Sequence, residues 1–135
     1  MSGRGAAPWV VAGVAVLLLG VTLMRTVHGS VTTHPDPRPG ITAAGVMPAA
    51  MVPAAPGARE AYEAARGAPQ VLDGIYCHCN CSKHSGHRSL LTCFESEHGA
   101  YCDICMGEAM LASQMAASGA SLDAIRKEID TRFGT

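Results

Sequence analysis

The longest uninterrupted apolar stretch lies near the N-terminus, where Ala6 to Met24 gives 19 residues without a charge between Arg4 and Arg25. As a helix, this run would be about 28 Å long, close to the bilayer's hydrocarbon thickness of about 30 Å. We therefore expect residues 1–28 to form one transmembrane anchor. A cleaved signal peptide is the alternative, but no A-x-A-like cleavage site follows the run. A lipoprotein is disfavoured because no cysteine lies near the end of the run.

The orientation of this anchor is inferred from its short N-terminal tail rather than from its flanking charges. Basic residues lie on both sides of the run, so the positive-inside rule discriminates little. A short N-terminal tail before such an anchor normally stays in the cytoplasm. We therefore expect a single-pass protein of the cell membrane, with the remaining chain on the extracytoplasmic side.

Residues 29–57 are rich in Pro, Ala, Gly and Thr, and seven of the eight prolines of the chain lie between Pro35 and Pro69. Prolines at this density break helices and remove backbone donors. The composition predicts a solvated, semi-extended linker between the anchor and the remaining chain.

From residue 58 onward, apolar residues recur with the spacing of one helical face. The segment 58–66 is rich in good helix formers and is followed by Gly67 as a stop. Ser89 can cap a short helix that runs through Leu90, Leu91 and Phe94. No strand pattern of useful length appears.

Two longer helices are predicted at the C-terminus. The first covers residues 101–118, with Ile104, Leu111 and Met115 on its apolar face and Gly119 as its C-cap. Ser121 caps the second helix, whose apolar stripe consists of Leu122, Ile125, Ile129 and Phe133. The fold class we expect is a small all-α domain over residues 58–135, with an irregular, metal-stapled Cys/His-rich loop, behind one N-terminal transmembrane helix.

Charge and composition narrow the possible functions. The net charge is −1, and the basic residues form no run, which argues against nucleic acid as a partner. Large apolar residues are scarce after residue 58, and so small a core usually needs a covalent or metal crosslink. The sequence does not identify a protein partner.

The candidate chemistry is concentrated in residues 77–105, which hold all six cysteines and four of the six histidines. Thiolates and imidazoles at this density are the ligands that zinc and Cu(I) prefer. We expect a Cys/His metal site and no catalytic residues. The candidate metal ligands are Cys77, Cys79, Cys81, His84, His87, Cys93, His98, Cys102 and Cys105.

Spacing suggests how these ligands converge. In an extended C-x-C-x-C backbone the three thiols would share one face, opposite His78 and Asn80. The C-x-x-C pair, Cys102 and Cys105, would lie on the first turn of the 101–118 helix, where the helix N-terminus favours the thiolate.

Two other readings of the cysteines stay open. An even number of cysteines in an oxidising compartment also fits a disulfide-bonded structural domain, although the interleaved histidines would then have no purpose. A thiol–disulfide redox protein using Cys102 and Cys105 is the main alternative to metal binding. Hydrolytic metal catalysis ranks below both, because no H-E-x-x-H occurs and Glu95, Glu97 and Glu108 are expected to be solvated.

The run IYCHCNCSKHSGHRSLLTCFESEHGAYCDICMGEA resembles a bacterial family named for its PCYCGC motif, made up of membrane-anchored or lipoprotein-like proteins of uncharacterised function. All three motif cysteines are kept, while Tyr76, His78 and Asn80 stand at the proline, tyrosine and glycine of the name. The resemblance implies an extracytoplasmic location and metal binding, without a settled activity. More weakly, C-x-x-C and the following helices are similar to thiol oxidoreductase subunits of cytochrome c maturation.

Overall fold

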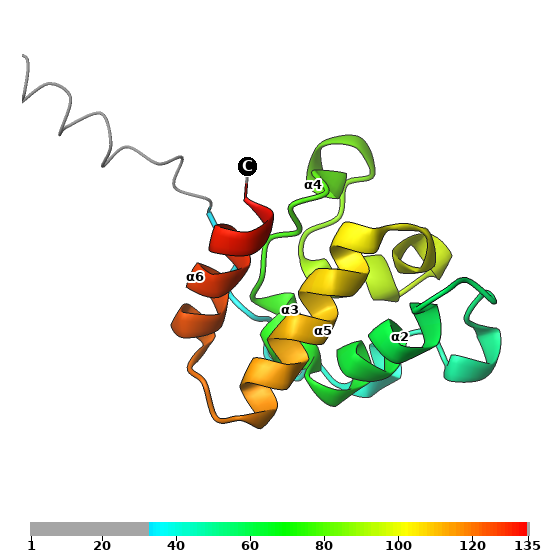
Figure 1. The fold of residues 1–135 in the computed structure, drawn as a ribbon, viewed down its shortest axis with the longest axis horizontal. Coiled ribbons are helices and arrows are strands. Elements are labelled where there is room, and N and C mark those ends of the chain that lie inside the picture. Colours follow the sequence, from blue (N-terminus) through cyan, green and yellow to red (C-terminus); the bar gives the residue numbers. More distant parts are fainter. Residues whose placement is uncertain (1–32, 135) are drawn as a thin grey trace, which may run out of the picture. The chain divides into compact units, whose positions relative to one another are not determined.

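The computed structural model describes residues 33–134, which belong to one compact unit. Within this range every regular element is helical, as predicted (Figure 1). The elements are η1 (Ala43–Gly45), η2 (Ala49–Met51), α2 (Ala58–Gly67), α3 (Pro69–Asp73), α4 (Cys81–His84), η3 (Leu90–Phe94), η4 (Glu97–Tyr101), α5 (Asp103–Ala117) and α6 (Leu122–Phe133).

The predicted membrane anchor, residues 1–28, lies outside the described residues. Between residues 33 and 134, no helix has both the length and the apolar character needed to cross a membrane.

Helices α5 and α6 form the predicted hairpin, and α2 packs along α5 (Figure 1). Gly119 ends α5 with φ of 82°, a left-handed conformation that glycine adopts readily. Ser121 then caps α6 by accepting a hydrogen bond from the Ala124 N–H at 3.3 Å. Ile125 and Ile129 are fully buried, which confirms the apolar stripe predicted for this helix.

The buried face of α5 agrees with the prediction only in part. Leu111 and Met115 are half-buried and pack against the core, whereas Ile104 is 39% exposed. The helix instead buries Cys105, Ala109 and Ala112. The facing helix α2 buries mainly alanines as well. Small residues on both helices let the two backbones approach closely.

Aromatic packing joins η3 to α2. The rings of Tyr62 and Phe94, both fully buried, meet edge to face with centroids 4.9 Å apart, a favourable arrangement for aromatic pairs. The Tyr62 hydroxyl donates a hydrogen bond to the Ser96 carbonyl at 2.6 Å. The residues that carry the ligands after Ser89 are therefore seated on the helical core.

Residues 33–57, which we call the N-terminal strap, do not form the solvated linker predicted for this stretch. Val46 is 1% exposed, and the Met47 N–H donates to the Phe94 carbonyl at 2.9 Å. Arg66 donates from α2 to the carbonyls of Ala43 and Val46. The strap contains the short turns η1 and η2, and its backbone polar groups pair both within these turns and with the residues against which the strap lies.

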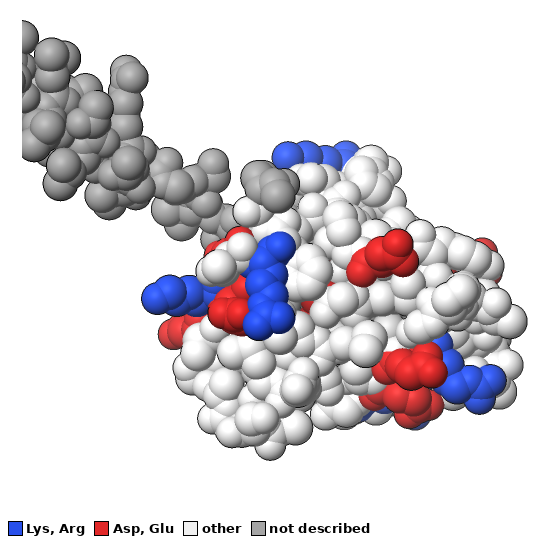
Figure 2. Space-filling view, in the orientation of Figure 1, with Lys and Arg blue, Asp and Glu red and all other residues white. Residues whose placement is uncertain are grey.

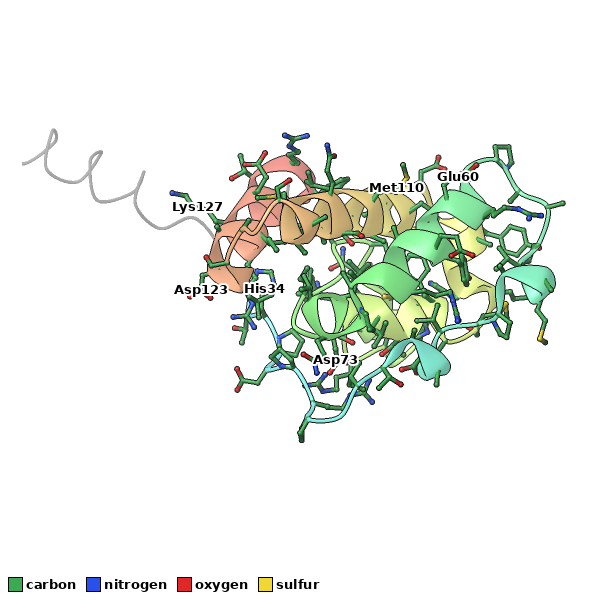
Figure 3. All side chains as sticks on the ribbon, turned by 90° about the horizontal axis from the view of Figure 1, so that it is seen from below. His34, Glu60, Asp73, Met110, Asp123 and Lys127 are labelled. Carbon is green, nitrogen blue, oxygen red and sulfur yellow. The ribbon has the colours of Figure 1, made fainter. Side chains whose placement is uncertain are left out.

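Polar contacts at His34 and Asp73, both labelled in Figure 3, hold the first part of the strap. The Tyr76 N–H donates to His34 Nδ1 at 3.0 Å. That nitrogen therefore carries no proton, and His34 Nε2–H donates to Asp130 on α6. Asp73 accepts hydrogen bonds from the backbone and guanidinium of Arg38 and from the Ser89 hydroxyl.

The Asp73 carboxylate is fully buried and also pairs with Arg88 at 3.0 Å. Burial alone would raise the pKa of this carboxyl, but the hydrogen bonds from Arg38 and Ser89 outweigh it and lower the pKa. The strap, α3 and the segment after the C-x-C-x-C motif are thus joined at one ionised carboxylate. Charged side chains otherwise lie scattered over the face shown in Figure 2, without a large patch of one sign.

Candidate metal centre

Eight of the nine predicted ligands come together around the start of α5. Their ligand atoms form four overlapping groups, within each of which all atoms lie within 4.8 Å of one another. The groups are Cys81, His87, Cys93 and His98; Cys77, Cys79 and Cys81; Cys77, Cys93 and Cys105; and Cys79, Cys102 and Cys105.

The C-x-C-x-C segment converges by turning, which corrects the extended backbone predicted for it. The Asn80 N–H donates to the Cys77 carbonyl at 3.2 Å, closing a turn. Asn80 has φ of 61°, and α4 begins at Cys81. In an extended strand the outer two thiols would be about 13 Å apart, whereas the turn brings all three within the 4.8 Å limit. Asn80 occupies the position of the motif's glycine and adopts the left-handed conformation that glycine favours.

The group of Cys81, His87, Cys93 and His98, hereafter the mixed group, is complete for a tetrahedral ion. The two sulfurs are 3.3 Å apart, and His87 Nδ1 is 3.3 Å from Cys93 Sγ. The rings of His87 and His98 are neighbours, with centroids 4.5 Å apart. Burial and the adjacent His98 lower the pKa of His87, which favours the neutral imidazole that a metal requires.

Gly99 explains how His98 reaches this group. A side chain at Gly99 would place its Cβ 2.9 Å from the Cys93 carbonyl oxygen, closer than packed atoms tolerate. The absence of a side chain lets η4 approach η3 and brings His98 beside Cys93.

The remaining four thiols, Cys77, Cys79, Cys102 and Cys105, are hereafter the four-thiol group. Cys102 is the N-cap of α5 and Cys105 lies in its first turn, as predicted from the C-x-x-C spacing. Cys77 Sγ lies 3.4 Å from Cys79 Sγ and 3.3 Å from Cys105 Sγ. Cys79 and Cys105 are 3.5 Å apart.

These distances favour metal coordination over disulfides. All six cysteines are free thiols, and the closest sulfurs are 3.3 Å apart, far beyond a disulfide bond of about 2.05 Å. Four sulfurs at about 2.3 Å from a zinc ion would be about 3.8 Å from one another. The sulfurs of Cys77, Cys79 and Cys105, which are 3.3–3.5 Å apart, therefore need to move outward by only a few tenths of an ångström to match that geometry.

Two buried thiols of the cluster, Cys77 and Cys93, are held in their protonated form. The hydrogen bond between Cys77 and Cys105, together with burial, raises the pKa of Cys77. At Cys93 the hydrogen bond from Cys105 lowers the pKa, but the contact with Cys77 and burial outweigh it, so the pKa is raised. Such thiols are poor nucleophiles by themselves. Binding of a metal ion would displace their protons.

His84 is the one predicted ligand that lies outside all four groups. Its side chain is exposed, and its ring nitrogens pair with the Ser85 hydroxyl at 3.0 Å and the Cys79 carbonyl at 3.3 Å. His84 therefore lies near the ligands on α4, but its ring nitrogens bond to the Ser85 hydroxyl and the Cys79 carbonyl instead of facing the thiols.

Glu108 is a residue of the site that the sequence pattern placed in solvent. It is fully buried, and its Oε1 accepts a hydrogen bond from the His78 N–H at 2.9 Å. The His78 ring meanwhile pairs with Asp130 at 2.9 Å. Burial raises the pKa of Glu108 to about 7. Its spacing of three residues from Cys105 puts both on one helical face, which is the signal that could have identified it.

An open hollow of about 640 Å³ borders the cluster. Two thiols of the four-thiol group, Cys79 and Cys102, line it and are half-buried. The other lining residues are His84, Ser96, Glu97, His98 and Tyr101. One edge of the four-thiol group is therefore open to solvent.

Comparison with known protein families gives a match over most of the chain. The sequence model of a family described as "Protein of unknown function with PCYCGC motif" matches residues 24–135. Neither a search of curated proteins nor a search of solved structures finds a match.

Proposed function

The chain belongs to the family of proteins of unknown function with the PCYCGC motif, and we propose that it is a membrane-anchored metal-binding protein that acts in metal handling outside the cytoplasm. The observation that carries the proposal is the convergence of six thiols and two imidazoles on one small volume. These are soft ligands at distances close to those of a metal centre. The role is binding rather than catalysis.

Zinc and Cu(I) are the ions that this donor set fits best. Tetrahedral sites with two sulfurs and two nitrogens are typical of zinc, and all-sulfur sites accept either zinc or Cu(I). The ligands come from several segments of the chain. Metal binding would therefore contribute folding free energy by fixing the turns between them.

The location rests on the sequence. The apolar run from Ala6 to Met24 has the length of a bilayer span, and a short N-terminal tail favours an extracytoplasmic C-terminal domain. In such a protein, the strap would connect the anchor to the metal-binding domain and also form part of its surface.

The direct test is the metal content of the full chain, purified in mild detergent without added metal. The whole chain is needed because residues 33–57 pack against the helices. We expect zinc or copper in a whole-number ratio to protein, by native mass spectrometry and elemental analysis, with six titratable thiols after chelation. A metal-free chain lighter by two hydrogens per disulfide would overturn the proposal.

A matched pair of histidine variants identifies the ligands. We expect His87→Ala to lose metal, because His87 belongs to the mixed group. His84→Ala should keep the wild-type ratio of metal to protein, because His84 lies outside every group. Equal losses from both variants would contradict the assignment of ligands.

Thiol–disulfide exchange is the second candidate function. It is favoured by the half-buried Cys102 at the start of α5, beside the open hollow, where an attacking partner could reach it. This function requires a depressed thiol pKa. Alkylation of Cys102 measured against pH would exclude it if the rate rises with an ordinary thiol pKa of about 8.5.

A further inference from the structure

Each ligand group has two buried and two half-buried members, and the groups differ in donor type and in which donors are half-buried, histidines in the mixed group and thiols in the four-thiol group. Both thiols of the mixed group are sealed inside, with Cys81 1% exposed and Cys93 fully buried. The four-thiol group contains only sulfur and has its two half-buried members, Cys79 and Cys102, at the hollow. Of the mixed group only His98 borders that hollow, so its sulfur ligands are out of reach from there.

The eight ligands divide into two sets of four without sharing. The mixed group supplies a full set of four ligands, because its four ligand atoms all lie within 4.8 Å of one another. Removing it leaves four thiols. Three of these form a further group, and the fourth, Cys77, lies within 3.4 Å of Cys79 and 3.3 Å of Cys105. Four ligands per ion is the coordination number that zinc adopts in closed protein sites.

Resting on the metal-binding function proposed above, we propose that the protein holds two ions with different roles. A zinc ion in the mixed group is structural and leaves slowly. A soft ion, zinc or Cu(I), in the four-thiol group is exchangeable and enters and leaves through the hollow at Cys79 and Cys102.

The geometry gives each role a physical reason. The ion in the mixed group joins α4, η3 and η4, three short elements that have little helical structure of their own. The ion in the four-thiol group lies against the first turn of the long helix α5, which is held by packing whether or not the ion is present. At the hollow an incoming ligand can bond to the ion as one metal–sulfur bond breaks, and this exchange requires no electron transfer.

The test is zinc release from the zinc-loaded full chain to an excess of a chromophoric chelator. We expect two zinc ions per chain, released in two phases whose rates differ at least tenfold. In Cys79→Ser and Cys102→Ser, the fast phase should disappear and one slowly released ion should remain. Cys79 and Cys102 lie at the hollow, so these variants have the best prospect of folding.

Cobalt(II) in place of zinc provides a second readout, because the sulfur-to-cobalt charge-transfer absorption grows with the number of thiolate ligands. The ion that remains in Cys79→Ser should show the weaker absorption of a site with two thiolates. The matched variant Cys81→Ser, two residues away, should lose the slow ion instead. If Cys81→Ser does not fold, the cobalt spectrum of Cys79→Ser still tests the division of ligands.

The outcomes separate this inference from the proposed function. A single ion per chain, a single release phase, or loss of both ions in Cys79→Ser would overturn the two-ion assignment while leaving metal binding intact. A chain that binds neither zinc nor cobalt would overturn the proposed function itself.

Discussion

The helical frame, formed by α2, α5 and α6, and the ligand loop, residues 74–102, differ in how much regular helical structure supports them. The frame contains the longest helix within residues 33–134, the 15-residue α5, and is stabilised by burial of apolar side chains such as Ile125 and Ile129. No helix in the ligand loop exceeds five residues. Buried Leu90, Leu91 and Phe94 seat η3 on the frame, whereas the turns on either side of η3 depend on buried polar contacts and on the Cys and His side chains.

This difference predicts two kinds of response to metal removal. Apolar burial in the frame does not depend on an ion, so α2, α5 and α6 should persist. Short helical turns are unstable by themselves, since nucleation costs more than one turn returns. The turns of the ligand loop on either side of η3 should therefore lose their structure when the ligands have no ion, while the packing of Phe94 on Tyr62 holds η3.

The largest effect is expected from removing a central ligand. Cys93→Ser should lower the free energy of unfolding of the metal-loaded protein by at least about 5 kcal/mol, because structural zinc contributes about 10 kcal/mol or more to folding. Denaturant unfolding with and without zinc measures this change. Ser82→Ala, exposed on α4, is the control and should match the wild type. An unchanged midpoint of denaturant unfolding for Cys93→Ser would show that no bound ion stabilises the ligand loop.

A large effect that is independent of metal is expected in the frame. Ile129→Ala removes a fully buried side chain and should cost about 3 kcal/mol, the usual range for such truncations. Thermal unfolding should show the same loss in metal-loaded and metal-free protein, and the metal content should not change. A loss seen only with metal bound would mean that frame and loop form one cooperative unit.

The buried carboxylate of Asp73 joins the strap to the loop. Its removal should lower the free energy of unfolding by somewhat less than the Ile129→Ala truncation. Asp73→Asn weakens the pairing with Arg38 and Arg88 and should lower stability by about 2–3 kcal/mol, as for lost hydrogen bonds between charged groups. Asp123→Asn is the matched control, since Asp123 is 91% exposed and pairs with Arg126 one turn away. Its cost should stay below about 0.5 kcal/mol.

The lowered pKa of Asp73 adds a pH dependence to this prediction. Because the folded pKa lies below the unfolded value of about 3.9, the carboxylate contributes stability above that value and loses it as pH falls through the folded pKa. The stability difference between wild type and Asp73→Asn should be constant above about pH 5 and shrink in more acidic solution. A difference that grows on acidification would contradict the assignment.

The smallest effect concerns the turn at Asn80. Asn80→Gly should change stability by less than about 0.5 kcal/mol, because relief of the positive φ and the greater freedom of the unfolded chain nearly cancel. Asn80→Val should cost about 1–2 kcal/mol, because a branched side chain is strained in this conformation. Chemical denaturation of both variants provides the comparison, and equal stabilities would argue against the left-handed turn.

The sequence predicts the features of the fold that depend on local signals, and it does not predict those that depend on residues far apart in the chain. The stripe of Ile125 and Ile129 with its Ser121 cap could be predicted, because helical periodicity and capping are local signals. The buried face of α5 could not, since the close approach of alanines depends on the facing helix. The packing of the strap depends on Asp73 and Asp130, partners far along the chain.

The candidate site shows the same limits. The ligand types and the C-x-x-C geometry were evident from spacing, whereas the turn at Asn80 and the outward position of His84 were not. Both depend on how α4 begins after a residue with positive φ, which residue spacing alone does not specify.

Hydrogen exchange of the full chain, with and without zinc, tests most directly the claim that ions hold the ligand loop while burial holds the frame. We predict that zinc slows exchange mainly in residues 74–102 and at the start of α5, and leaves α2 and α6 unchanged. Equal protection of the ligand loop in both states, or a uniform loss over the whole domain without zinc, would contradict the account.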